Sequence, residues 1–168
     1  NDISVAYSRA AFALLSRNFL TVLRDPGNHE ARAAMLLGSA FAGTAIENSM
    51  LGAAHSAANP LTAHFGIVHG EAVGLMLPHI MRLNLTDPAA WEEYTQLAAT
   101  LGLAGDALPD WLTGILEAAS LPTAVRPGLL TPENLPILSK EAAGQWTAQF
   151  NPVAVDAAVF TKLYSTAS

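Results

Sequence analysis

Histidines gather in one apolar stretch of the chain, residues 52–84. His55, His64 and His69 fall within fifteen residues of one another, and His79 follows soon after. Imidazoles among small and apolar residues are poorly solvated, so each needs a hydrogen-bonding group, a proton or a metal as a partner. Because the chain has no cysteine, a metal here would be held by His, Asp, Glu or water, which suits iron(II), zinc, manganese or nickel.

The two outer histidines of this group, His55 and His69, are fourteen positions apart. On one unbroken helix they would stand roughly 21 Å apart, whereas two ligands of one metal each lie about 2 Å from it. The Asn59-Pro60 step is expected to end the first helix, because a residue before proline is driven out of the α region. Gly66 then allows the chain to reverse, and His69 stands where the next helix would begin. This arrangement can bring the two imidazoles to one point.

The elements that must position these side chains are helices. Capping signals support them: Asn28 precedes a helix, and Asp87 and Thr131 are each followed by proline. No sustained two-residue alternation and no Asn-Gly or Asp-Gly hairpin signal predicts strands. We therefore expect an all-α bundle of seven to nine helices, with helices near 5–23, 30–48, 50–58, 70–83, 88–101, 111–119, 132–143 and 155–164.

Composition limits the possible functions. With 168 residues, the chain has the length of one domain, and we expect 1–168 to form a single domain. The formal net charge is −6 and the basic residues are scattered, which argues against nucleic acid or an anionic membrane as a partner. No apolar run reaches the about 18 residues of a membrane span. A content of 51% hydrophobic and 13% charged residues favours association with a second domain or in a homo-oligomer, and cytoplasm is the default location.

Residues 52–84 read GAAHSAANPLTAHFGIVHGEAVGLMLPHIMRLN. This stretch resembles the C-terminal signature of the iron-containing (group III) alcohol dehydrogenases, roughly GxxHxxxHxxGxxxxxxHGxxxxxxLPHVxxxN. The resemblance implies that His55 and His69 are ligands of a catalytic divalent metal, Fe²⁺ first and Zn²⁺ as the alternative. Asn59 stands where the family has a histidine close to the reacting alcohol, which is a departure from the pattern. The VHG and LPHI segments match at 68–70 and 77–80.

The resemblance also implies what surrounds this chain. It covers the helical C-terminal half of a two-domain enzyme, a dehydroquinate synthase-like C-terminal domain, and the Asn151-Pro152 step near the end fits that half. NAD or NADP would be bound mainly by a missing N-terminal Rossmann-like domain, and no glycine-rich phosphate loop occurs in these residues. The family's other two metal ligands, an Asp and a His, precede the position of Asn1. We therefore expect the fragment alone to be inactive toward an alcohol or aldehyde substrate.

Several alternatives remain open at the level of sequence. Asn59 either lies beside the substrate or is only a helix stop before proline. His64 could take over proton transfer, although a solvent-facing loop histidine is the commoner situation, and His79 is expected to be a structural, hydrogen-bonded histidine. The chain could also belong to a glycerol dehydrogenase- or dehydroquinate synthase-like metalloenzyme. The remaining hypothesis is a non-catalytic helical packing or interaction domain.

Overall fold

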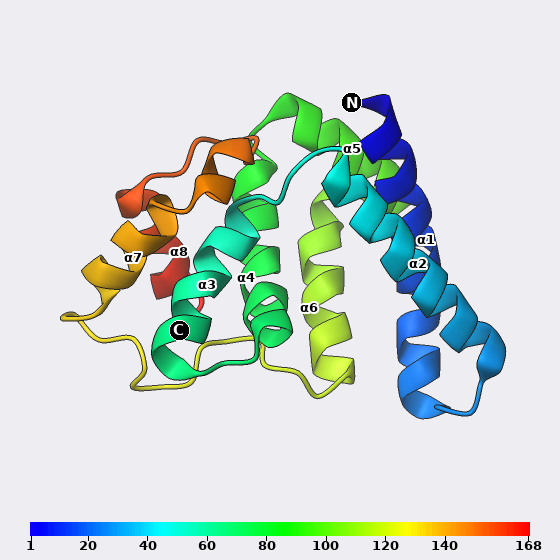
Figure 1. Ribbon diagram of the computed structural model, residues 1–168, viewed down its shortest axis with the longest axis horizontal. Coiled ribbons are helices and arrows are strands. Elements are labelled where there is room, and N and C mark those ends of the chain that lie inside the picture. The colour runs from blue at the N-terminus through cyan, green and yellow to red at the C-terminus, as the bar shows by residue number, and fades with distance from the viewer. The chain divides into compact units, whose positions relative to one another are not determined.

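The computed structural model describes residues Asn1–Ser168 and contains eight α-helices and two short 3₁₀ helices, without strands (Figure 1). This confirms the predicted all-α fold. The chain forms two compact units, residues 1–50 and 51–168, and the prediction that 1–168 is one domain stays a prediction. No helix combines the length and the hydropathy that a membrane span requires.

The first unit is a hairpin of two helices, α1 (Asp2–Arg24) and α2 (His29–Glu47). Asn1 caps α1 through a capping box, because its side chain accepts from the backbone of Ser4. Asn28 caps α2, as predicted: its side chain accepts from the backbone N–H of Ala31. The Asn1 carboxamide also donates to the carbonyl of Asn48, 2.6 Å away, and so joins the open end of the hairpin.

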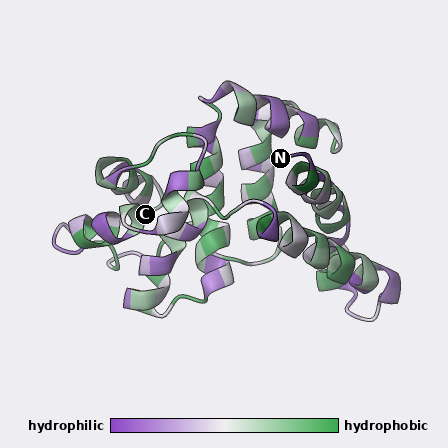
Figure 2. Ribbon diagram, turned by 45° about the horizontal axis from the view of Figure 1, so that its top comes forward, coloured by the Kyte–Doolittle hydropathy of each residue, from purple (hydrophilic) through white to green (hydrophobic).

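The second unit holds the remaining helices, with its core between α3, α4, α7 and α8. In Figure 2, hydrophobic and hydrophilic residues interleave along the helices, as expected where each helix buries one side. The elements are α3 (Ala53–Phe65), α4 (His69–Asn84), α5 (Pro88–Ala99), η1 (Gly105–Ala107), α6 (Leu108–Ala118), α7 (Leu135–Ala143), η2 (Trp146–Phe150) and α8 (Ala157–Thr166).

Helix α3 does not end before proline, so the prediction of a helix stop at Asn59-Pro60 is wrong: α3 runs through Pro60 to Phe65. Proline removes one helical donor and crowds the preceding turn. Tertiary contacts offset this cost, since Pro60 is buried in the core and the Tyr164 hydroxyl donates to the carbonyl of Ala57, at 2.7 Å. The predicted reversal after the helix is confirmed, because Gly66 adopts φ +66° at its end.

Helix α7 begins at Leu135, so the prediction that Thr131-Pro132 starts it is wrong. Thr131 and Asn134 instead bond one another: the Thr131 N–H donates to Asn134 Oδ1 at 2.9 Å, and the Asn134 N–H donates to Thr131 Oγ1 at 3.3 Å. This local pairing satisfies the polar groups in a turn, which competes with helix formation. A later proline, Pro136, occupies the first turn of the helix.

The predicted helix start at Asp87-Pro88 is confirmed. The Asp87 side chain accepts from the backbone N–H of Ala90 at 2.9 Å, and Pro88 is the first residue of α5. The helix ends at Ala99, two residues short of the expected end, and Gly102 with φ +73° follows.

Candidate functional site

The reversal between α3 and α4 brings His55 and His69 together. From His55 to the end of α3 the chain advances about 15 Å. The three residues that follow, ending in an extended Val68 (φ −55°, ψ 129°), can climb back by about 10 Å. The imidazole rings of His55 and His69 lie side by side, with centroids 5.4 Å apart and planes tilted by 50°. Sequence reasoning placed both residues correctly relative to the turn, although it ended the first helix too early.

This separation fits two ligands of one divalent ion. Metal–nitrogen bonds of about 2.0–2.1 Å, with bond angles near 90–120°, place two ligating imidazole centroids about 4.5–5.5 Å apart. The rings of His55 and His69 fall within that range. No group of three or more His, Cys, Asp or Glu side chains in the chain could hold a metal, so this pair is what the chain itself offers.

Burial favours the neutral form of the His55 imidazole. Burial lowers the pKa of His55, and the neighbouring His69 ring, when charged, lowers it further. A neutral imidazole is the form that can donate a lone pair to a metal. His55 is half-buried in the first turn of α3, whereas His69 is exposed as the first residue of α4. The His55 ring is therefore partly enclosed by the fold, whereas the His69 ring is accessible to solvent.

Asn59 lies one helical turn after His55, on the same side of α3. Its Nδ2 donates to Gln145 Oε1 at 2.9 Å, in a partly buried position. Thr62 follows on this side of the helix, and its buried Oγ1 has no hydrogen-bond partner in the chain. Sequence reasoning missed Gln145, because 86 residues separate it from Asn59 and no motif includes it.

The other two histidines of the signature stretch lie elsewhere. His64 belongs to the last turn of α3, so its expected place in a loop is wrong; its Nε2 lies 2.8 Å from Glu141 Oε2. Nine residues of helix separate it from His55, which turns the two to opposite sides of α3. His79 pairs with Thr166, with Nδ1 and Oγ1 3.4 Å apart, as expected of a hydrogen-bonded histidine.

Two asparagines fix the start of α3, two residues before His55. Asn84 Nδ2 donates to Asn151 Oδ1 at 3.1 Å, and Asn151 Nδ2 donates to Asn84 Oδ1 at 2.7 Å. Asn151 Oδ1 also accepts from the backbone N–H of Ala53 at 3.4 Å, at a helix start whose own cap, Gly52, has no side chain. The last asparagine of the signature and the Asn-Pro step near the end of the chain thus meet at one point.

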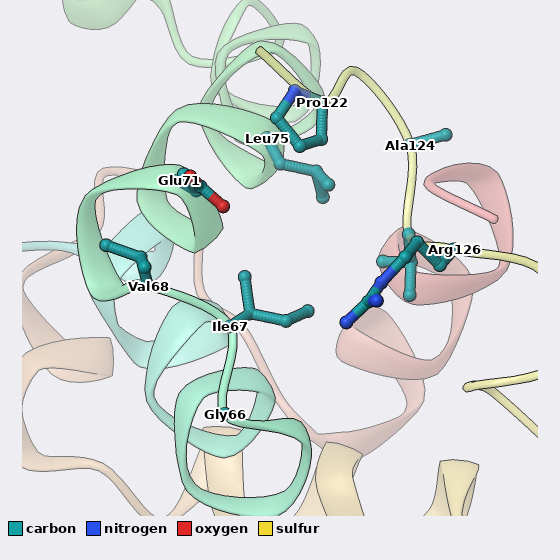
Figure 3. A pocket seen from close by; sticks show the side chains of 9 residues that line it. Gly66, Ile67, Val68, Glu71, Leu75, Pro122, Ala124 and Arg126 are labelled. Atoms are coloured by element: carbon teal, nitrogen blue, oxygen red, sulfur yellow. The ribbon is translucent and has the colours of Figure 1, made fainter.

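A cavity of about 320 Å³ lies beside the first turn of α4. Glu71 and Arg126 line it from opposite sides, with Ile67 and Leu75 among its apolar residues, and both charged groups extend toward its interior (Figure 3). Neither His55 nor His69 is among the residues that line it. This cavity is separate from the imidazole pair, and nothing in the sequence had indicated it.

Comparison with known families and curated proteins shows consistent similarities. The model of the Fe-containing alcohol dehydrogenase family, C-terminal part, matches residues 1–168. Lactaldehyde reductase of Escherichia coli (strain K12) is 29% identical over 150 residues, which are 84% of this chain and 39% of that protein. The 1,3-propanediol dehydrogenase of Klebsiella pneumoniae is 32% identical over 102 residues, 61% of this chain and 26% of its own length. The chain thus spans about two fifths of lactaldehyde reductase.

Solved structures share the fold. An alcohol dehydrogenase from Oenococcus oeni superposes with a TM-score of 0.90 at 23% identity, over 100% of this chain and 46% of that one. Sulfoacetaldehyde reductase from Bifidobacterium kashiwanohense, solved in complex with NAD⁺, superposes with a TM-score of 0.87 at 25% identity, over 98% of this chain and 43% of that one.

Proposed function

Because the chain belongs to the Fe-containing alcohol dehydrogenase family, as its C-terminal part, we propose that it supplies the metal-binding helical half of an NAD(P)-dependent alcohol dehydrogenase. The observation that carries this proposal is the pair of imidazoles of His55 and His69, whose centroids are 5.4 Å apart. The match of the whole chain to the family supports it.

In this proposal, His55 and His69 hold one divalent ion, Fe²⁺ or alternatively Zn²⁺, from the helical side. Catalytic metals take about three protein ligands, so the Asp and His of the family pattern would complete the set from a segment outside these 168 residues. When bound, the ion supplies a Lewis acid for the alcohol or carbonyl oxygen. The nicotinamide cofactor is held mainly by an N-terminal domain, and the chain alone does not turn over.

The overall reaction converts an alcohol and NAD(P)⁺ into an aldehyde or ketone, NAD(P)H and a proton. The carbon-bound hydrogen leaves with its electron pair to the nicotinamide ring, and the hydroxyl proton passes to water. The relatives named above act, by their names, on lactaldehyde, 1,3-propanediol and sulfoacetaldehyde. These share a backbone of two or three carbons, so we propose a short-chain alcohol or aldehyde as the substrate.

Large exposed apolar side chains support contact with the N-terminal domain or in a homo-oligomer. Leu36 is 71% exposed, Trp146 57% and Ile137 53%. Side chains of this size are favoured at interfaces and are costly to leave in water.

The test measures bound metal and turnover in the full-length protein. We expect about one equivalent of iron or zinc in the wild type, and a loss of metal affinity and activity on the order of 100-fold or more in His55→Ala and in His69→Ala, since each removes a direct ligand. His29→Ala, at an exposed histidine of α2, is the matched control and keeps both. An unchanged metal content in both site variants would refute the proposal.

A further inference from the structure

Only the amide nitrogen of the Asn59 side chain makes a hydrogen bond within the chain. Its Nδ2 donates to Gln145 Oε1 at 2.9 Å, whereas its Oδ1 accepts no hydrogen bond within the chain. Asn59 is half-buried and lies one turn after His55 on the same side of α3. The free polar atom of Asn59 is therefore an acceptor, close to one member of the imidazole pair.

Gln145 is itself fixed by the contacts that follow it. The next residues form η2, which packs along α3: Ser56 Oγ and Thr147 Oγ1 are 2.8 Å apart and both residues are buried. Further on, Asn151 accepts from the N–H of Ala53. Segment 145–151 thus runs antiparallel to α3, and the Asn59–Gln145 bond is the first of three ties between them.

We propose that Gln145 is a positioning residue, which fixes the Asn59 carboxamide so that its Oδ1 is presented as the hydrogen-bond acceptor for the hydroxyl group of the substrate alcohol. This inference rests on the proposed function. An amide oxygen accepts an O–H but does not remove its proton at neutral pH. The contact therefore binds the alcohol, which has a donor at this position, and is absent for the aldehyde, which has none.

Gln145→Met in the full-length enzyme tests this role, because methionine keeps the length of the side chain and removes its acceptor. We expect the KM for the alcohol to rise roughly 5- to 15-fold, the value of one neutral hydrogen bond, with kcat changed less than about 3-fold. The KM for the aldehyde stays unchanged. The aldehyde kcat falls instead, since the overall equilibrium constant is fixed.

Three controls separate positioning from a structural role. Gln145→Glu keeps the acceptor and restores the alcohol KM to within about 3-fold of the wild type. Gln149→Met changes an exposed glutamine of η2 and has no effect. In an Asn59→Ala background, Gln145→Met adds no more than about 2-fold, because the group it positions is gone.

Each other outcome overturns the inference. An unchanged alcohol KM in Gln145→Met does so. The inference also fails if Gln145→Met raises the alcohol KM as much in the Asn59→Ala background as in the wild type. A fall in metal content or in Tm that persists in Gln145→Glu assigns Gln145 a structural role instead. Each of these results refutes the inference alone, provided that the wild-type enzyme is active and contains metal. A wild type without metal and without turnover overturns the proposed function, and this inference with it.

Discussion

At the scale of single residues, metal binding at the proposed site would depend on a competition between protons and metal for the same lone pairs. Burial, and then the neighbouring His69, lower the pKa of His55, so its ring stays neutral to lower pH than a free imidazole near 6.5. A metal held by this ring displaces fewer protons as pH falls toward 6. The half-buried position of His55 in the first turn of α3 thus favours the neutral ring, which is the form that the proposed metal site needs.

A second half-buried histidine, His79, makes the stability of the protein depend on pH. Burial, and then the charge of Arg82, lower the pKa of His79. The unfolded chain, with a pKa near 6.5 for this group, then binds the proton more readily than the folded chain. The stabilisation is therefore complete above about pH 6.5 and is lost as pH falls through that value toward the folded pKa.

Replacing this histidine by glutamine should flatten that dependence. For metal-free full-length protein, we expect the free energy of unfolding to fall between pH 7.5 and pH 5, with His79 contributing less than about 1 kcal/mol, because a partly exposed group is screened by solvent. Denaturant unfolding of His79→Gln at the two pH values measures the contribution. His29→Gln is the control at an exposed position. Equal slopes in the wild type and His79→Gln would contradict this account.

At the scale of elements, α3 continues through Pro60 with a hydrogen bond from α8 on the turn before the proline. The Tyr164 hydroxyl donates to the carbonyl of Ala57, three residues before the proline, at 2.7 Å. Burial, and then the charge of Glu141, raise the pKa of Tyr164, so the hydroxyl stays protonated and remains a donor. Pro60 deprives the Ser56 carbonyl of its helical donor, and the Tyr164 bond to the next carbonyl ties this disturbed turn to α8.

Tyr164→Phe should therefore destabilise the protein by about 1 kcal/mol, the net value of one buried hydrogen bond. The change keeps the ring and so creates no cavity. Urea unfolding of the full-length protein measures the difference. Tyr7→Phe, at an exposed tyrosine of α1, is the matched control and should lie within about 0.5 kcal/mol of the wild type. A loss as small in Tyr164→Phe would show that this hydroxyl does not stabilise the turn around Pro60.

Helix ends that depend on residues adjacent in the sequence could be predicted from the sequence. Asn28, Asp87-Pro88 and Gly66 act within one turn: the first two begin their helices and Gly66 reverses the chain, as expected. The predicted stop at Asn59-Pro60 failed because tertiary contacts support the helix, among them burial of Pro60 and the bond from Tyr164, 107 residues from its acceptor Ala57. Local rules do not include such partners.

The candidate site likewise has a part that could be predicted from the sequence and a part that could not. The turn that faces His55 toward His69 follows from a short segment and from the family pattern, so it could be predicted. The partners that fix the site could not, because Gln145 lies 86 residues from Asn59 and Asn151 lies 98 residues from Ala53. Only the fold brings these side chains within hydrogen-bonding distance.

At the scale of the whole molecule, apolar burial is divided unequally between the two units. The buried core cluster, from Ala53 to Ala167, falls entirely within residues 51–168. Residues 1–50 bury only small side chains, at Ser4, Ala11, Ala31 and Ala45, along with Gly38. A two-helix hairpin of this length lacks the core that a domain needs to fold alone, since segments below about 40–60 residues are marginal even with large buried side chains.

We therefore expect fragment 51–168 to fold without the first unit, whereas fragment 1–50 does not fold alone. Circular dichroism should show a helical, cooperatively melting spectrum for 51–168 and little helix for 1–50 at the same temperature. Phe160→Ala in 51–168 is the internal check: removing this fully buried ring should cost about 3–5 kcal/mol and abolish or strongly lower the melting transition. Cooperative melting of 1–50, or a non-cooperative 51–168 that Phe160→Ala leaves unchanged, would show that the core does not act as the independent unit inferred from its burial.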